Sequence, residues 1–253
     1  MCVPHGRRGR GGSRRTSGPV TGLRSSGAGV VVVGGDAGAG AELVAGLEDL
    51  GARVETIDAE ELRGRGQARR LFDDAANRLR GIDAVVMATV GAEPTRRGAL
   101  AELDAEAWRS RVEVPLHRTL SCFQAAHHYL RGVGGTVVLL VPTLSLTGAA
   151  GFAPWAAVTE GQRALAKAAA RAWGKDAITV NCVAVAGAML GSDSTHSDQS
   201  ELSMDRPGLP HPSLASPEPR TDVARVVHAL LAPAWRAVTG ATIAVDAGVW
   251  MTP

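Results

Sequence analysis

The sequence predicts an α/β fold: a single Rossmann-like domain with a doubly wound parallel sheet. Two observations lead to this fold. Short apolar runs alternate with amphipathic segments along the chain, as expected for strands joined by helices. The first two of these elements are separated by a glycine-rich turn. With 253 residues, of which 45% are hydrophobic and 21% charged, the chain is long enough for one such domain.

The opening segment, 29–58, has the pattern of a nucleotide-binding βαβ unit. Val30 to Val33 form an all-apolar strand suited to burial on both faces. The turn after it has the spacing G-x-x-x-G-x-G, which lets a diphosphate approach backbone N–H groups at a helix start. An acid about twenty residues further on can bind the ribose hydroxyls. The candidate cofactor-binding residues are Gly34, Gly35, Asp36, Gly38, Ala39, Gly40 and Asp58.

The remaining chain continues the alternation. Hydrophobic periodicity predicts helices at 59–80, 108–131, 154–173 and 221–232. Apolar, β-branched runs predict strands at 82–86, 136–141, 178–183 and 241–245. The polar, proline-rich segment 191–219 is expected to be a long loop.

Residues 1–29 are predicted to be a disordered basic tail that precedes the domain at 30–253. The tail has six arginines and no acid, so of a formal net charge of +2 the rest of the chain carries −4. A nucleic-acid-binding arm is one interpretation of the tail, but we favour a solvated tail or an over-extended start, with no nucleic-acid partner. No apolar segment suits a signal peptide or a membrane span. Three scattered cysteines and no H-x-x-x-H spacing predict a cytoplasmic protein without a metal site.

At this point the chain resembles the short-chain dehydrogenase/reductase family over residues 30–251. The matching features, in order, are the glycine turn, Ile82–Asp83, Trp108, the V-N-x-V element 180–183, Thr239–Gly240 and the V-D-A-G element 245–248. The resemblance implies a Rossmann-like fold, a nicotinamide cofactor and oligomers built from two long helices. It also implies a departure: only 23 residues separate Asp58 from Ile82, where the family has a helix, a strand and a second helix. We therefore expect one edge strand and one helix to be missing.

The resemblance also implies the loss of the family's catalytic set. The family's tyrosine, lysine, serine and asparagine positions fall on Trp155, Thr159, Pro142 and Pro115. Indole does not ionise in the relevant range, threonine carries no cation and proline donates no hydrogen bond. We therefore assign no catalytic residue, and whether the chain is an enzyme stays open.

Substitute groups were sought among the neighbouring polar residues. Thr143, Ser145, Glu160 and His196 are the candidates. The chain's one tyrosine, Tyr129, lies too far along the preceding helix and is expected to be a packing residue.

For the cofactor we expect none or weak NAD. Asp36 places a carboxylate inside the phosphate turn, and no arginine accompanies it or Asp58 to hold a 2′-phosphate. The family's N-N-A-G is replaced by the segment 87–90, and the missing edge strand removes part of the adenine pocket.

The leading hypothesis is a redox-deficient subunit that forms a homo- or hetero-oligomer, most simply with an active short-chain dehydrogenase. The predicted helices 108–131 and 154–173 carry apolar residues beyond the face that covers the sheet. Two alternatives remain. One is a non-redox step such as dehydration, cyclisation or isomerisation, and the other is an NAD-dependent oxidoreductase whose proton comes from substrate or water.

Overall fold

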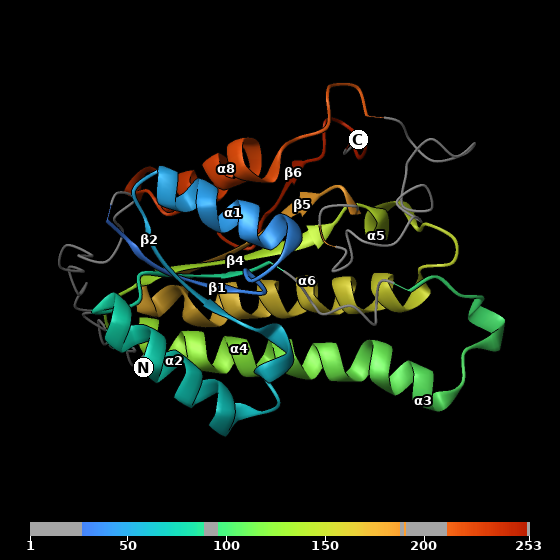
Figure 1. Ribbon diagram of the computed structural model, residues 1–253, viewed down its shortest axis with the longest axis horizontal. Coiled ribbons are helices and arrows are strands. Elements are labelled where there is room, and N and C mark those ends of the chain that lie inside the picture. Colours follow the sequence, from blue (N-terminus) through green and yellow to red (C-terminus); the bar gives the residue numbers. More distant parts are fainter. Residues whose placement is uncertain (1–26, 89–95, 188–189, 191–211, 252–253) are drawn as a thin grey trace, which may run out of the picture.

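The computed structural model describes residues 27–88, 96–187, 190 and 212–251 (Figure 1). Its centre is a parallel sheet of six strands in the order β2-β1-β3-β4-β5-β6. The strands are β1 (Gly29–Val33), β2 (Arg53–Ile57), β3 (Ala84–Met87), β4 (Gly135–Pro142), β5 (Ile178–Val185) and β6 (Thr242–Val245). The predicted doubly wound, Rossmann-like fold is confirmed.

Helices cover both faces of this sheet, as Figure 1 shows. One face carries α1 (Gly38–Asp49) and α8 (Ala224–Leu230), and the other carries α2 (Arg65–Leu79), α4 (Val114–Leu130) and α6 (Ala153–Trp173). Each face has its own buried cluster: Val30 and Val32 belong to the first, and Val31 and Val33 to the second. Because successive strand residues point to opposite faces, β1 has to be apolar throughout. None of the described helices is long and apolar enough to cross a bilayer.

The connection from β2 to β3 contains one short helix, η1 (Ala59–Glu61), and α2, with no strand. Among the described residues β2 therefore pairs only with β1 and forms an edge of the sheet. Right-handed connections that run in opposite directions along a sheet place their helices on opposite faces. This is why α2 lies with α4 and α6, across the sheet from α1. The predicted absence of an edge strand and its helix is confirmed.

The predicted helix 108–131 is divided into α3 (Ala105–Trp108), the π-helical η4 (Arg109–Glu113) and α4. Pro115 explains the change, because proline has no N–H to donate and its ring crowds the carbonyl four residues earlier. A π-helical turn accommodates such an interruption. The predicted helix 59–80 likewise begins later, at Arg65, because Asp58 caps η1 first.

Other short helices complete the chain. They are η3 (Leu100–Glu102), α5 (Leu144–Thr147), η5 (Gly174–Asp176), η7 (Pro219–Val223) and η8 (Pro233–Trp235). Most of the predicted tail and loop, residues 1–26 and 191–211, lies outside the described residues. The last residue of the predicted tail, Gly29, is instead the first residue of β1. The last residue of the predicted loop, Pro219, is the first residue of η7.

Gly46 of α1 lies directly against η7, and this contact can be tested. A Cβ added at Gly46 would lie 2.1 Å from the carbonyl oxygen of Arg220. We expect Gly46→Ala to lower the free energy of unfolding by about 1–3 kcal/mol, measured as a lower urea midpoint. The control is Gly66→Ala in α2, whose added Cβ meets nothing within 4 Å; it should be neutral or stabilising by up to about 1 kcal/mol. Equal effects of the two substitutions would contradict the close approach of α1 and η7.

Candidate cofactor cleft and active site

The glycine turn connects β1 to α1 at the carboxyl edge of the sheet. Gly34 and Gly38 have φ angles of +78° and +53°, which favour glycine. A Cβ on Gly40 would lie 2.1 Å from the carbonyl oxygen of Gly34, and one on Gly35 would lie 2.7 Å from Cγ2 of Val44. No side chain caps α1. The backbone thus has the geometry of a phosphate-binding turn.

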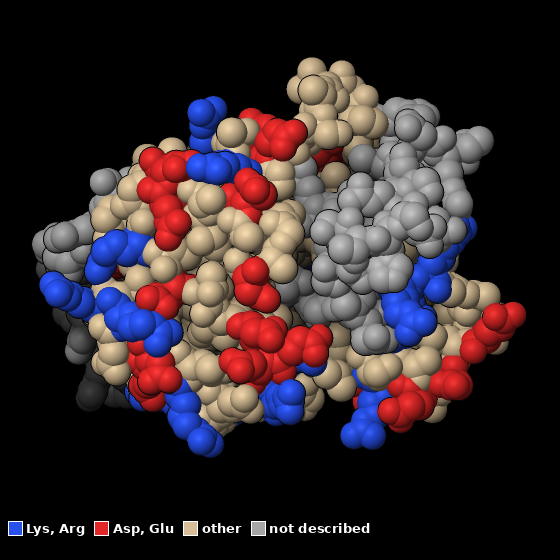
Figure 2. Space-filling model, in the orientation of Figure 1, with Lys and Arg blue, Asp and Glu red and all other residues tan. Residues whose placement is uncertain are grey.

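Carboxylates surround this turn. Asp36 is exposed within it, and Asp58, Glu60 and Glu61 are exposed just after β2. Oδ1 of Asp58 accepts a hydrogen bond from the backbone N–H of Glu60 at 2.8 Å, so the carboxylate expected to bind a ribose already caps η1. Figure 2 shows acidic side chains gathered in the middle of this face. A diphosphate at the turn would be repelled by these charges.

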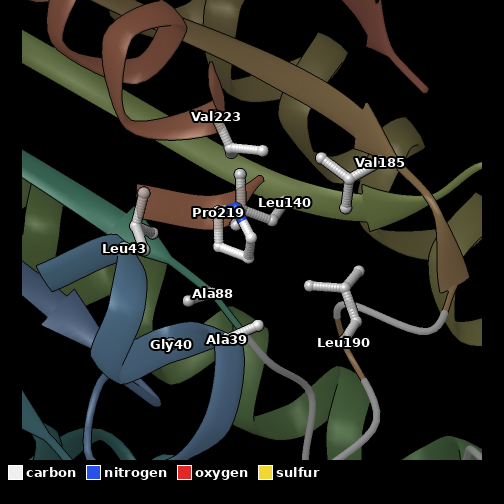
Figure 3. Close-up of a pocket in the computed structure, with 9 residues that line it drawn as sticks. All are labelled: Ala39, Gly40, Leu43, Ala88, Leu140, Val185, Leu190, Pro219 and Val223. Atoms are coloured by element: carbon white, nitrogen blue, oxygen red, sulfur yellow. The ribbon is translucent and has the colours of Figure 1, made fainter. Parts of the chain in front are cut away.

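Apolar side chains fill the cleft beside the turn (Figure 3). The remaining cavity has about 10 Å³, which is room for about one water molecule. Pro219 of η7 and Leu190 project into it from the segments on either side of the gap 191–211. The other lining residues are Ala39, Gly40, Leu43, Ala88, Leu140, Val185 and Val223. The described side chains therefore leave little free space directly beside the turn.

Trp155 and Thr159 lie one turn apart in α6, and both are fully buried. Phe152 packs edge-on against Trp155, with ring centroids 6.1 Å apart. Neither Nε1 of Trp155 nor Oγ1 of Thr159 has a hydrogen-bond partner among the described residues. The position expected for an ionisable acid is thus occupied by a large side chain packed into the core.

Pro142 ends β4, and the next residue, Thr143, is a structural residue. The Thr143 hydroxyl lies 3.0 Å from Oδ2 of Asp246 and 3.1 Å from the carbonyl oxygen of Val185. Asp246 is buried and also accepts the backbone N–H groups of Gly248 and Trp250, each at 3.0 Å. Thr143 therefore holds the end of β4 to the turn after β6, and its hydroxyl is already engaged in this contact.

The other substitute groups are not brought together. The Ser145 hydroxyl donates to the carbonyl oxygen of Pro142 at 3.1 Å. Glu160 is exposed and pairs with Arg163 at 2.7 Å along α6, so it faces solvent and not the cleft. His196 lies outside the described residues.

Tyr129 is a packing residue, as predicted. Its ring stacks on Phe72 with centroids 6.1 Å apart, and the Arg69 guanidinium lies 5.3 Å from the ring centre. The Tyr129 hydroxyl donates to Asp73. Burial, reinforced by this hydrogen bond, raises the pKa of Tyr129, which keeps the phenol neutral.

Sequence reasoning missed two buried polar residues, Arg111 and Gln162. Arg111 of η4 is 9% exposed. Gln162 of α6 is buried and donates from Nε2 to the Thr119 hydroxyl at 2.9 Å. Gln162 follows Trp155 by seven residues and so lies on the same face of α6. That spacing is a signal in the sequence, although the surrounding segment is rich in alanine.

The fold and the turn define a Rossmann-type α/β protein, and the comparisons give its family. Residues 18–250 match the family profile described as enoyl-(acyl carrier protein) reductase. The chain is 30% identical over 230 residues to cis-4-hydroxycyclohexanecarboxylate dehydrogenase of Sinomonas cyclohexanicum, covering 87% of this chain and 86% of that protein. The chain belongs to the short-chain dehydrogenase/reductase family.

Two further proteins are similar to the chain. Subunit BbsD of a hydroxy(phenyl)methylsuccinyl-CoA dehydrogenase from Thauera aromatica is 30% identical over 176 residues, which are 61% of this chain and 70% of that protein. The crystal structure of a 3-ketoacyl-(acyl-carrier-protein) reductase from Brucella melitensis, complexed with NADH, has the same fold. Its TM-score is 0.74 at 14% identity, with 90% of this chain and 100% of that chain covered.

A metal site is not indicated by the described part of the chain. No group of three or more His, Cys, Asp or Glu side chains in it is placed to hold an ion.

We expect NAD to bind weakly or not at all, and NADP to bind more weakly still. Asp36→Ser should tighten NAD binding, because one carboxylate leaves the phosphate turn; a gain of about 1.4 kcal/mol would be tenfold in affinity. Isothermal titration calorimetry measures this, with Glu48→Gln near the other end of α1 as the control. Tight NAD binding by the unmodified chain would mean that the cleft opens readily and that the carboxylates do not repel the ligand.

Proposed function

We propose that this chain is a redox-deficient member of its family that serves as a subunit beside an active short-chain dehydrogenase. The observation that carries the proposal is Trp155, fully buried in α6 where the family resemblance places the proton-donating tyrosine. A buried indole provides packing and no titratable proton.

The replaced positions support the proposal together. Carbonyl reduction by hydride needs a proton at the developing alkoxide, and a positioned acid is commonly worth about 10²–10⁴ in rate. Thr159 supplies no cation to lower the pKa of such an acid, and Pro142 supplies no hydroxyl to polarise the carbonyl. Pro115 further removes the supporting amide. Since the acid, its activating group and the carbonyl donor are replaced at once, restoring one of them leaves the others absent.

The outer surfaces of α4 and α6 are where we place the partner. Leu120, Ala164 and Ala168 are exposed there, and small side chains permit close helix approach. Phe123 and Ala169, which are also apolar residues of these helices, are buried within the subunit and are not part of this surface. One relative is named as a subunit of a dehydrogenase, which is in keeping with a role in assembly. The free, buried thiols of Cys122 and Cys182 suit the cytoplasmic location that we infer.

The two alternative functions have less support. Thr143, Ser145 and Glu160 are engaged in local hydrogen bonds or face solvent. A non-redox enzyme, or an oxidoreductase with an unusual proton donor, would therefore depend on His196 or on the substrate itself.

The purified chain alone should show no NAD(P)-linked ketone reduction or alcohol oxidation above background. Trp155→Tyr combined with Thr159→Lys should not restore activity, because Pro142 and Pro115 remain. The activities of the unmodified chain and of the double variant are measured from the absorbance of the reduced cofactor, with a range of ketone and alcohol substrates. Turnover that survives Glu160→Gln and Thr143→Val would contradict the proposal and also our choice of substitute residues.

Assembly is tested by placing a charge on the proposed surface. The chain is produced together with the short-chain dehydrogenase whose gene lies nearest to its own. Under these conditions Ala168→Glu should dissociate the oligomer or make the chain insoluble. A specific interface buries more than roughly 1,000 Å². A carboxylate within it would lose its hydration without gaining a partner, which strongly disfavours association. Ala234→Glu in η8, also at an exposed alanine, is the matched control. Sedimentation that shows a stable monomer, alone and with that dehydrogenase, would rule out the assembly role.

A further inference from the structure

A second site lies on the opposite side of η1 from the cofactor cleft. A groove of about 570 Å³ separates the end of η1 from η4 and the start of α4. Leu62 and Arg63 form one wall, and Arg109, Glu113, Val114, His117 and Arg118 form the other. The groove falls within the usual size range of small-molecule sites, about 300–1,000 Å³.

Cationic side chains dominate this groove. Arg63 and Arg109 are exposed, and neither takes part in an ion pair among the described residues. Arg118 is half-buried and pairs with Oε1 of Glu60 at 3.4 Å. Three arginines thus line a space whose described carboxylates are Glu113, in the lining, and Glu60, which pairs with Arg118.

Glu60 orders two of these arginines. Its carboxylate contacts Arg118 of α4, and its backbone carbonyl oxygen accepts a hydrogen bond from Nε of Arg63 at 3.3 Å. Because Glu60 lies in η1, this short helix ties the segment after β2 to α4. A pair of arginines held in this way loses less side-chain freedom when it binds an anion.

The groove follows from the short connection between β2 and β3. Without an intervening strand and helix, η1 packs next to α4 and brings Arg63 to the groove. Val114, which is 38% exposed, adds an apolar surface between the charges, and the buried Leu62 lies beneath the groove. The site therefore combines guanidinium forks, which match phosphate oxygens, with a surface for an apolar or aromatic group.

We propose that this groove binds a small phosphate-bearing molecule through Arg63, Arg109 and Arg118. Phosphate fits better than a single carboxylate because several guanidinium groups can share its oxygens. The site is independent of the glycine turn, where carboxylates and apolar side chains oppose such a ligand, and it does not depend on the proposed function.

Calorimetry on the full chain at low salt tests the proposal, with inorganic pyrophosphate and ADP as the probes. Both should bind, with pyrophosphate affinity falling at least about fivefold in Arg109→Gln and further in Arg63→Gln/Arg109→Gln. Glu113→Gln should tighten binding, because it removes the opposing charge. These residues are exposed, so the variants should retain the wild-type thermal transition, which is checked in parallel.

Two controls locate the binding. Arg171→Gln, an exposed arginine of α6 outside the groove, should leave the affinity unchanged and so exclude a general charge effect. Asp36→Ser, which favours binding at the glycine turn, should not restore the affinity that is lost in the double arginine variant; restoration would place the probe at the turn. The proposal is overturned if neither probe binds, or if binding persists undiminished in the double arginine variant.

Discussion

The packing of α1 on η7 is the contact on which the state of the cleft depends. Gly46 lets the Arg220 backbone approach α1 more closely than any side chain would permit. That approach carries Pro219 into the space beside the glycine turn, where Leu43, Leu140 and Val223 complete an apolar lining. The Asp49–Arg220 ion pair at 2.9 Å is exposed on both sides and adds little. Close backbone packing, more than charge, therefore holds η7 against α1.

The short connection after β2 has effects on both sides of the sheet. It makes β2 an edge strand and places α2 beside α4. It also turns the chain into η1 at once, so that Asp58 caps a helix at the position where a ribose would bind. The same η1 carries Glu60, which orders Arg63 and Arg118 on the far side. The short connection thus bears both on the expected ribose contact of Asp58 and on the cationic groove.

Much of the fold was predictable because local pattern and topology agree. The all-apolar β1, the glycine turn and the 23-residue spacing after Asp58 together predict a Rossmann-like sheet that lacks one edge strand. Pro115 indicates an interruption of the predicted helix 108–131. Where the π-helical η4 ends and α4 begins depends on how α4 packs against its neighbours. The closure of the cleft could not be predicted, since Pro219 reaches it from a segment whose own sequence has no period.

In the candidate site, too, some features follow from local sequence and others depend on tertiary packing. The proposed replacement of the catalytic positions could be inferred from the sequence once the family was recognised. The engagement of Thr143 by Asp246 is not, because those residues are 103 positions apart and meet only through the pairing of β4, β5 and β6. Glu160 was ambiguous for a different reason: adjacent residues of a helix differ by about 100° in direction, and Thr159 is buried while Glu160 faces solvent.

A glycine turn in this fold has two physical roles, and the structure separates them. Gly40 has to lack a side chain because a Cβ would lie 2.1 Å from the Gly34 carbonyl oxygen, and Gly35 because a Cβ would meet Val44 and Val32. Both contacts are internal to the βαβ unit and need no ligand. The turn would therefore be required for α1 to pack on β1 even in a chain that binds no cofactor. Its presence identifies the fold, whereas binding depends on what surrounds it: the carboxylates at Asp36 and Asp58 and the apolar side chains that close the cleft.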